Sequence, residues 1–249
     1  MSLKQRFTSG EMSYGAWTGF ADPQVAQIMG RAGFDFICVD LQHSFVTMAQ
    51  LSPLLDALHK ADSPAVVRVP WNTPDLIMRS LDLGAEAIIV PLVNNAEEAR
   101  SAANACRYAP AGNRSWGPIW RNVRASIPQA PEGDAAATCL VMIETAEGLA
   151  NVDAILAVDG VDGIYIGPND LSLSIGLERK GYLESDKLRE TILHVIARGR
   201  AAGKIVGIDC GGPEQAHYWR DQGVSFVISA NDSDLIAQAA SAMAKSNRA

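Results

Sequence analysis

The sequence predicts a single (β/α)8 barrel domain of the α/β class spanning residues 1–249. Eight short apolar runs alternate with segments that have the spacing of amphipathic helices, which is the order expected of an α/β protein. Most of these runs are apolar throughout, as are parallel strands that are buried on both faces. No GxGxxG motif follows the first run, which weighs against the competing doubly wound open sheet.

The expected strands recur along the whole chain. They lie at Tyr14–Trp17, Phe36–Val39, Ala65–Val69, Ala87–Val90, Cys139–Ile143, Gly163–Ile166, Ile205–Ile208 and Ser225–Ile228. The expected helices between them are Pro23–Ala32, Met48–Ala61, Pro74–Leu83, Ala96–Tyr108, Asp186–Ala202, Pro213–Asp221 and Ser233–Lys245, together with a helical segment after Glu144. Glycines at 33, 84, 203 and 223 follow four of these helices, where a left-handed residue commonly ends a helix.

One connection, residues 109–137, is far longer than an ordinary helix-to-strand loop. It contains two tryptophans, Trp116 and Trp120, and three arginines, Arg114, Arg121 and Arg124. Its length predicts an active-site cover or a subunit contact. The alternative is a surface excursion that is packed by its own tryptophans.

Composition excludes several classes of protein. Hydrophobic residues make up 48% and charged residues 20%, as in ordinary globular proteins. The net charge of −7 and the lack of any Lys/Arg run argue against nucleic-acid binding. No apolar run is long enough to span a membrane, and the N-terminal segment has no signal-peptide core. The four cysteines lie far apart without a CxxC pair, which indicates a reduced, cytoplasmic setting.

The stretch from Val141 to Ser174 is predicted to form strand, helix and strand, with Glu144 just past the first strand and Asp170 just past the second. Parallel neighbouring strands end at the same edge, so these two carboxylates should converge. Two hard oxygen ligands suit a divalent cation such as Mg²⁺ or Mn²⁺. The alternative is that Glu144 caps the following helix and Asp170 closes a turn. Spacing alone leaves both interpretations open.

In a barrel of this kind the reactive face lies at the carboxyl ends of the strands. The residues expected there, in strand order, are Trp17; Asp40, Gln42 and His43; Arg68; Pro91; Glu144; Asn169 and Asp170; Asp209 with Cys210, Gly211 and Gly212; and Ala230 with Asn231. Side chains capable of chemistry gather where the fold would need them, which predicts an enzyme.

His43 is the only histidine expected at a strand end, and it could act as a general base or a metal ligand. Asp40 lies close enough in sequence to orient its ring. Asp82, from the helix after the third strand, is a second candidate for that role. The alternative is a loop histidine that is bonded to backbone.

Arg68 lies in an otherwise apolar strand, where an arginine is costly unless it is paired or binds an anion. At the mouth of the barrel it could grip a carboxylate with two hydrogen bonds and stabilise an enolate. The alternative is a structural ion pair with a carboxylate on a neighbouring strand. The functional role is favoured because arginines at strand ends in barrels commonly face the site.

Together these residues predict metal-assisted carbon–carbon chemistry. A divalent cation would chelate a 2-oxo acid through its carboxylate and keto oxygens, Arg68 would neutralise the developing enolate, and His43 would move a proton. No lysine is expected at a strand end, which disfavours a Schiff-base aldolase.

Four stretches carry a family resemblance: FDFICVDLQHS, VVRVPWNTPDLIMRSLDLGAEAIIVPLVNNAEEARSAANACRYAPAGNRSWGP, VMIETAEGLANVDAILAVDGVDGIYIGPNDLSLSIG and GIDCGGP. They resemble the HpcH/HpaI aldolase/citrate lyase family, class II pyruvate aldolases that include 4-hydroxy-2-oxoheptanedioate aldolase and 2-dehydro-3-deoxyglucarate aldolase. The resemblance implies a phosphoenolpyruvate/pyruvate-type barrel with a swapped C-terminal helix, assembled as a homohexamer of paired subunits. It implies reversible retro-aldol cleavage of a 4-hydroxy-2-oxo acid to pyruvate and an aldehyde.

The resemblance also assigns residues. The metal ligands for Mg, Mn or Co fall on Glu144 and Asp170, the catalytic histidine on His43 with Asp82 as its partner, and the pyruvate-binding arginine on Arg68. Asp40 joins the catalytic set. The remaining residues expected to contact substrate are Trp17, Met142, Gly167, Pro168, Asn169 and Asp209.

Three departures from the family pattern concern substrate choice. Gln42 stands where the family usually has Glu, and Met142 where it usually has Gln. The family's Gly-x-Arg-Gly-x-Gly loop carries Ser115 and Trp116, and a tryptophan beside the mouth would narrow the aldehyde pocket. Hydroxypyruvate is a further candidate donor if Met142 leaves different room. The alternative functions are a related lyase or decarboxylase acting on oxaloacetate or a citryl-CoA-type ester, and a non-catalytic homologue.

Overall fold

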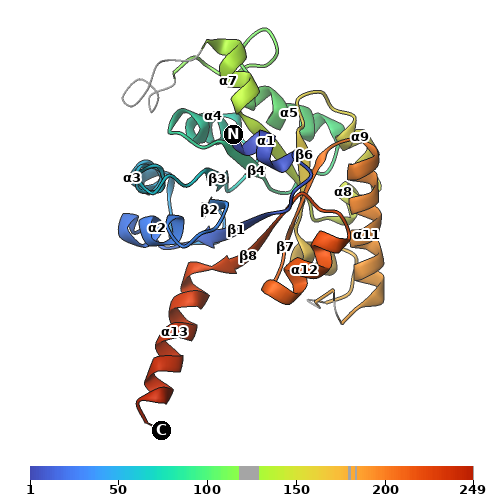
Figure 1. Ribbon diagram of the computed structural model, residues 1–249. Coiled ribbons are helices and arrows are strands. Elements are labelled where there is room, and N and C mark those ends of the chain that lie inside the picture. The colour runs from blue at the N-terminus through green and yellow to red at the C-terminus, as the bar shows by residue number, and fades with distance from the viewer. Residues whose placement is uncertain (118–128, 179–180, 183, 249) are drawn as a thin grey trace.

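Eight parallel strands close into one barrel in the computed structural model, which describes residues 1–117, 129–178, 181–182 and 184–248 (Figure 1). Each strand pairs with the next along the chain, and β8 pairs with β1. The strands are β1 (Ser13–Thr18), β2 (Phe36–Asp40), β3 (Ala65–Arg68), β4 (Ala87–Val90), β5 (Thr138–Ile143), β6 (Gly163–Ile166), β7 (Ile205–Asp209) and β8 (Phe226–Asn231). The predicted (β/α)8 barrel is confirmed, with every expected strand present.

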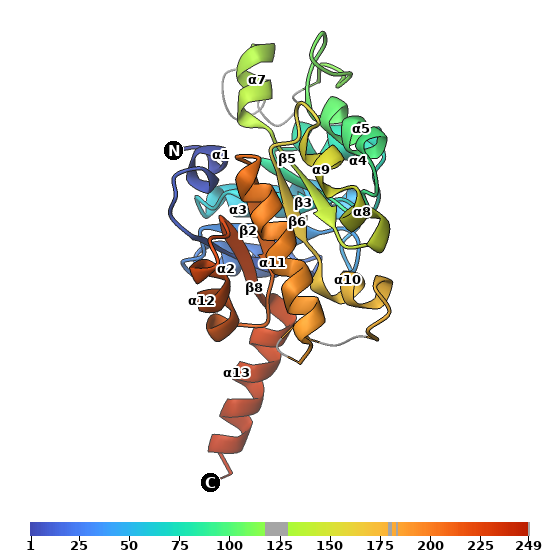
Figure 2. The same ribbon diagram turned by 90° about the vertical axis from the view of Figure 1, so that its right-hand side faces the viewer.

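Helices cover the outside of the barrel (Figures 1 and 2). They are α1 (Leu3–Phe7), α2 (Pro23–Gly30), α3 (Met48–Lys60), α4 (Pro74–Asp82), α5 (Ala96–Cys106), α7 (Ala130–Ala136), α8 (Ala146–Ala150), α9 (Val152–Leu156), α10 (Pro168–Ser174), α11 (Asp186–Ala201), α12 (Pro213–Asp221) and α13 (Asp232–Ser246). The segment after Glu144 forms two short helices rather than one. Sequence reasoning missed α1, α7 and α10.

The helix ends follow the chemistry read from the sequence. Asp22 caps α2 by accepting hydrogen bonds from the backbone N–H groups of Gln24 and Val25. The four glycines after helices all have positive φ, from +66° to +114°, as a left-handed C-terminal residue requires.

The core has two layers. One lies between the strands and the outer helices, and the other fills the inside of the barrel. The rings of Phe36 and Phe226 fill the interior at the end where the strands begin, and Phe7 of α1 closes that end by stacking on Phe226 at 4.4 Å between ring centroids. A Cβ on Gly15 would lie 2.2 Å from the Phe36 ring, and one on Gly207 would lie 2.1 Å from the Phe226 ring, so only glycine fits.

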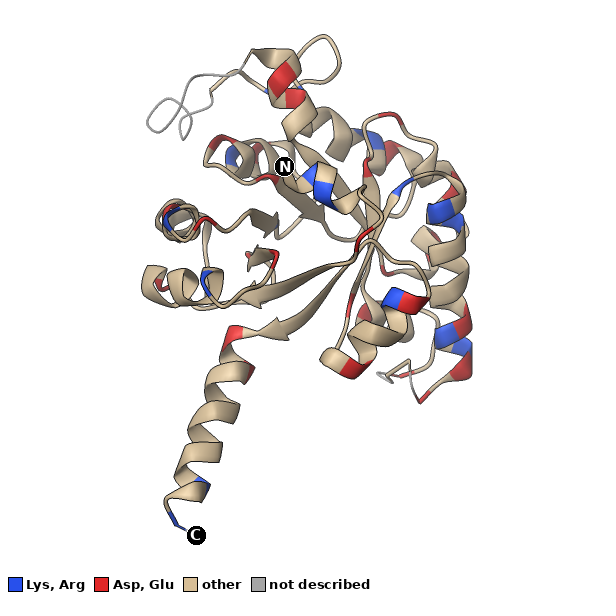
Figure 3. Cartoon of the chain, viewed as in Figure 1, with Lys and Arg blue, Asp and Glu red and all other residues tan. Residues whose placement is uncertain are grey.

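Helix α13 projects away from the barrel (Figures 1 and 2). Among its residues, all of which are described, only Asp232 is buried, whereas the apolar side chains of Leu235, Ile236 and Met243 are exposed. Figure 3 shows that the charged residues of this helix lie near its two ends, with Asp232 and Asp234 in the first turn and Lys245 in the last. Asp232 fixes the first turn of α13 to the barrel, because its Oδ2 accepts hydrogen bonds from Thr18 Oγ1 and from the backbone N–H groups of Gly19 and Phe20.

Across the described residues, no helix combines the length and the apolar character that a membrane crossing needs.

Candidate active site

A cavity of about 140 Å³ opens at the carboxyl ends of the strands. Its walls come from β1, β3, β5, β6 and β7 and from the segments that follow β2, β5 and β6. The lining residues are Trp17, His43, Arg68, Met142, Glu144, Tyr165, Gly167, Pro168, Asn169, Asp170 and Asp209. Ten of these eleven residues were predicted from the sequence as site residues, the exception being Tyr165. The fold brings all of them to one cavity.

The position of Glu144 depends on one hydrogen bond and on one close approach to a glycine. Its Oε1 accepts a 2.7 Å hydrogen bond from the backbone N–H of Leu92, a residue with the unusual φ of +55°. A Cβ on Gly167 would lie 2.7 Å from Glu144 Oε2, so the glycine allows the carboxylate to approach β6. Thr145, not Glu144, caps the following helix by accepting from the backbone N–H of Gly148. The capping role considered for Glu144 is therefore wrong.

Asp170 lies beside Glu144, in the first turn of α10 rather than in a simple turn. Burial is the main effect that raises the pKa of Glu144 to about 7. The negative charge of Asp170 acts in the same direction, and the Leu92 N–H and the Arg68 charge oppose the rise. A cation shared with Asp170 would favour the charged form of Glu144, and both groups supply hard oxygen ligands, so the donor set fits a divalent metal ion.

Among the described residues there is no group of three or more His, Cys, Asp or Glu side chains that could hold a metal ion. A cation between Glu144 and Asp170 would therefore complete its coordination with water or substrate oxygens. Mg²⁺ commonly binds in this way, through one or two carboxylates.

Arg68 is both ion-paired and part of the cavity wall. Its Nε and Nη2 donate to the two carboxylate oxygens of Asp40, at 2.9 and 2.8 Å, across the β2–β3 pair. Burial alone would lower the pKa of Arg68, but the Asp40 carboxylate outweighs that effect and raises it. The guanidinium carbon also lies 4.4 Å from the centroid of the Trp17 ring. Arg68 therefore forms the structural ion pair and also lines the cavity, and its role in binding a substrate stays a prediction.

Asp40 does not have the role suggested for it as a partner of the His43 ring. Its carboxylate accepts from Arg68 and from the backbone N–H groups of Gln42 and His43. These bonds fix the loop after β2 and leave the imidazole of His43 exposed at the cavity.

Asp82 lies at the other end of the barrel. Helix α4 runs back from the site, so its last residue is near the start of β4. Its Oδ1 accepts a 2.7 Å hydrogen bond from Arg114 Nη2, and the guanidinium of Arg114 packs over the Tyr108 ring. The structure therefore does not bring Asp82 to His43 within one chain.

Asp209 and Tyr165 form the wall beside Trp17. Oδ1 of Asp209 accepts from Trp17 Nε1 at 2.8 Å and from the Tyr165 hydroxyl at 3.4 Å. Burial raises the pKa of Asp209, while the Trp17 hydrogen bond and the Arg68 charge oppose the rise. Sequence reasoning missed Tyr165, although it is the one polar side chain in an apolar run and alternates with residues that face outward.

Residues 13–239 match the family described as HpcH/HpaI aldolase/citrate lyase. The chain belongs to this family. A protein named hydroxypyruvate/pyruvate aldolase from Rhizorhabdus wittichii is 37% identical over 94% of this chain and 93% of its own length. A protein named 4-hydroxy-2-oxo-heptane-1,7-dioate aldolase from Salmonella dublin is 35% identical over 98% of this chain and 93% of its own length. A solved HpcH/HpaI family structure from Burkholderia cenocepacia has a TM-score of 0.91 at 28% identity and covers 99% of both chains. Named relatives are aldolases, which are carbon–carbon lyases, so this family member is a carbon–carbon lyase.

The long connection places its described parts, residues 109–117 and 129–137, at the end of the barrel opposite the cavity. It joins α5 to β5 and so leaves from the end where the strands begin, and α7 within it lies at the opposite end of the molecule from α13 (Figures 1 and 2). The ring of Trp116 packs on Tyr108, 4.9 Å between centroids, so Trp116 does not narrow the mouth of the cavity in this chain. Trp120, Arg121 and Arg124 lie outside the described residues.

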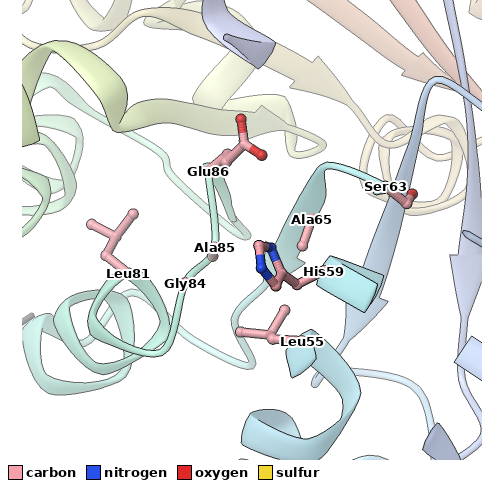
Figure 4. Close-up of a pocket in the computed structure, with 8 residues that line it drawn as sticks. All are labelled: Leu55, His59, Ser63, Ala65, Leu81, Gly84, Ala85 and Glu86. Carbon is pink, nitrogen blue, oxygen red and sulfur yellow. The ribbon is translucent and has the colours of Figure 1, made fainter. Parts of the chain in front are cut away.

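A second cavity, about 100 Å³, lies at the end where β3 and β4 begin (Figure 4). The labelled lining residues include His59 of α3, Ser63 and Glu86. Figure 4 shows the Glu86 carboxylate and the Ser63 hydroxyl pointing away from the His59 ring rather than toward a common point. Barrels of this class carry out chemistry at the other face, so this cavity is not the candidate active site.

Proposed function

We propose that the chain is a divalent-metal-dependent class II aldolase. It would cleave 4-hydroxy-2-oxo acids reversibly to pyruvate, or a related 2-oxo acid, and an aldehyde, in the cytoplasm. The observation that carries this proposal is the meeting of Glu144, Asp170, Arg68 and His43 at one cavity. Two relatives support it: the name of one specifies an aldolase for a 4-hydroxy-2-oxo acid, and the name of the other specifies an aldolase for hydroxypyruvate and pyruvate.

The residues of the chain divide the work. Glu144 and Asp170 would hold the cation, which supplies Lewis-acid polarisation of the 2-oxo group when bound. The hydrogen bonds to Asp40 use Nε and Nη2 of Arg68, so Nη1 is left to attract the negative oxygens of the substrate. The exposed imidazole of His43 would take the proton from the 4-hydroxyl as the carbon–carbon bond breaks, directly or through water.

The test is pyruvate release from a panel of 4-hydroxy-2-oxo acids. The protein is first treated with EDTA, and Mg²⁺, Mn²⁺ or Co²⁺ is then restored. We expect release to stop with EDTA and to return with metal. Release that continues in full after metal removal would contradict the metal assignment, and no release with any metal from folded protein would contradict the aldolase assignment.

The proposed assembly is a homohexamer in which α13 packs on a neighbouring subunit. The exposed apolar side chains of α13 support this, because a projecting helix with Leu235, Ile236 and Met243 exposed gains stability when another chain covers it. Light scattering on the full chain and on a chain ending at Asn231 would test it. Loss of the hexamer is expected on truncation.

If Asp82 is the partner of His43, as the family resemblance implies, it must come from a neighbouring subunit. The two residues lie at opposite ends of one barrel. Mixing an inactive His43→Ala chain with an inactive Asp82→Ala chain would then restore activity in part, since some sites in a mixed oligomer regain both residues. No recovery from verified mixed oligomers would exclude a shared site.

A further inference from the structure

The loop after β4 carries the backbone N–H that reaches Glu144. Leu92 donates this hydrogen bond at 2.7 Å, although its φ of +55° is one that residues other than glycine rarely adopt. Among the described residues, no other group donates a hydrogen bond to the Glu144 carboxylate. The orientation of that carboxylate therefore depends on where the Leu92 N–H points. An unusual backbone conformation of this kind persists only where the surrounding contacts hold it.

Asn94 is the residue that ties this loop to its surroundings. Its Nδ2 donates to Leu92 O at 3.0 Å, and its Oδ1 accepts from Thr145 Oγ1. Its backbone N–H donates to Glu98 Oε2 at 2.7 Å, and its backbone carbonyl accepts from Asn151 Nδ2 at 2.8 Å. One residue thus links the loop after β4 to α5 and to the segment that follows β5.

The direction of these hydrogen bonds follows from what each partner can offer. Leu92 O only accepts, so the side-chain atom of Asn94 beside it is the amide nitrogen, and this turns Oδ1 toward Thr145. Thr145 Oγ1 accepts from the backbone N–H of Gly148 at 2.9 Å, and its single proton goes to Asn94. A network whose donors and acceptors match in this way holds its members rigidly.

We infer that Asn94 is a positioning residue for the cation site: it holds Leu92 so that the Leu92 N–H orients the Glu144 carboxylate for a divalent ion. This inference rests on the proposed metal-dependent function. Asn94 is not one of the residues that line the cavity, so it acts through Leu92. Removing a hydrogen-bonding partner behind a metal ligand commonly weakens metal binding by about 10–100-fold. The indirect contact of Asn94 predicts the lower end of this range.

The experiment measures the dissociation constant of Mn²⁺ by calorimetry, on the full chain without substrate. It is done at about pH 8, where protons compete little with the cation. Asn94→Ala removes both side-chain hydrogen bonds and is expected to weaken Mn²⁺ binding by about tenfold. If this variant does not fold, Asn94→Leu supplies the same comparison, because it nearly keeps the size of the side chain and also removes both hydrogen bonds.

Asn95→Ala is the matched control. Asn95 caps α5, since its Oδ1 accepts from the backbone N–H groups of Glu97 and Glu98. Loss of this cap should lower the melting temperature and leave the Mn²⁺ affinity as in wild type. A merely structural role for Asn94 would give the same pattern in both variants. Wild-type affinity in folded Asn94→Ala would overturn the inference, and so would an equal loss of affinity in Asn95→Ala.

Leu92→Gly tests the route through Leu92. Glycine keeps the N–H and adopts a positive φ without strain, so the conformation depends less on Asn94. Asn94→Ala should therefore weaken Mn²⁺ binding less in the Leu92→Gly chain than in wild type, which a double-mutant cycle measures. An equal loss in both chains would overturn the route through Leu92.

Hydrogen exchange separates this inference from the proposed function. The exchange rate of the Leu92 N–H in the metal-free protein does not depend on a cation or on turnover. Asn94→Ala should raise this rate, and Asn95→Ala should not. If both the rate and the Mn²⁺ affinity stay unchanged in Asn94→Ala, only the inference fails. If wild type binds no Mn²⁺, the metal assignment and the inference fail together. Mn²⁺ binding that depends on Asn94, in a protein that cleaves none of the acids, would uphold the inference and reject the aldolase.

Discussion

The two ends of the barrel interior differ in chemical character: one is aromatic and the other carries charged side chains. Where the strands begin, Phe7, Phe36 and Phe226 pack ring against ring and exclude water. Where the strands end, Glu144 and Arg68 occupy the same lumen as charged groups. The first end lowers the free energy of folding through apolar burial. The second end raises it, because a carboxylate with a pKa near 7 is held where its charge is disfavoured.

This division means that stability and activity should respond to different substitutions. Removing a charged group at the carboxyl end should affect turnover and spare the fold. Removing a ring at the other end should do the reverse.

Glu144→Ala should have the largest effect. Loss of one of the two carboxylates that would hold the cation is expected to lower metal-dependent kcat/KM by about 10³-fold or more. The melting temperature of the metal-free protein should not fall, since the variant removes a buried group whose charge is disfavoured. Steady-state kinetics and calorimetry measure the two quantities.

Glu147→Ala is the matched control for that variant. Glu147 is exposed on α8, three residues further along, so both quantities should stay close to wild type. Full metal-dependent activity in Glu144→Ala would remove Glu144 from the site.

Phe7→Ala tests the other end. Phe7 is 2% exposed and stacks on Phe226, so its loss should lower the free energy of unfolding by about 3–5 kcal/mol. The value of kcat/KM, measured well below the new melting temperature, should hardly change. Ile28→Ala, at a side chain that is 68% exposed, should leave stability almost unaltered. A large loss of kcat/KM in folded Phe7→Ala would show that the two ends are coupled.

The barrel could be predicted because its signals are local. Continuous apolar runs indicate buried parallel strands, and a glycine in the left-handed conformation just after a helix indicates where that helix ends. The convergence of Glu144 and Asp170 could be predicted for the same reason, since neighbouring parallel strands end at one edge.

Other features depend on direction and distance that short motifs do not contain. A helix after a strand runs back to the opposite end, so the last residue of α4, Asp82, is far from His43, which follows the end of β2. The same reversal carries Trp116 away from the mouth. Helix α1 has only five residues, and its stability comes from packing under Phe36 and Phe226, which no local pattern reveals.

Metal affinity should depend on pH through Glu144. Its pKa in the folded protein is about 7, above its ordinary value of 4.5, so protons compete with the cation below pH 7. The apparent affinity for Mn²⁺ should fall by about tenfold per pH unit between 7 and 5 and level off above 7. The stability of the metal-free protein should change with pH in the opposite direction to the metal affinity. The raised pKa of Glu144 stabilises the fold below pH 4.5, and this contribution to the free energy of unfolding is lost as the pH rises to 7. Calorimetric titration and thermal melts across this range measure both trends. An affinity that does not change with pH would contradict the burial of this carboxylate.

His59→Ala should have the smallest effect and sharpens the comparison of the two ends. His59 is exposed and lines the second cavity, at the end where the strands begin (Figure 4). Because the proposed chemistry lies at the far end of the barrel, kcat/KM and its metal dependence should match wild type. Loss of an exposed side chain should change the free energy of unfolding by only about 0.5 kcal/mol or less. Steady-state kinetics of pyruvate release and a urea titration would check this. A marked fall in kcat/KM with unchanged stability would mean that the cavity around His59 takes part in function, and the division between a stabilising end and a reactive end would then fail.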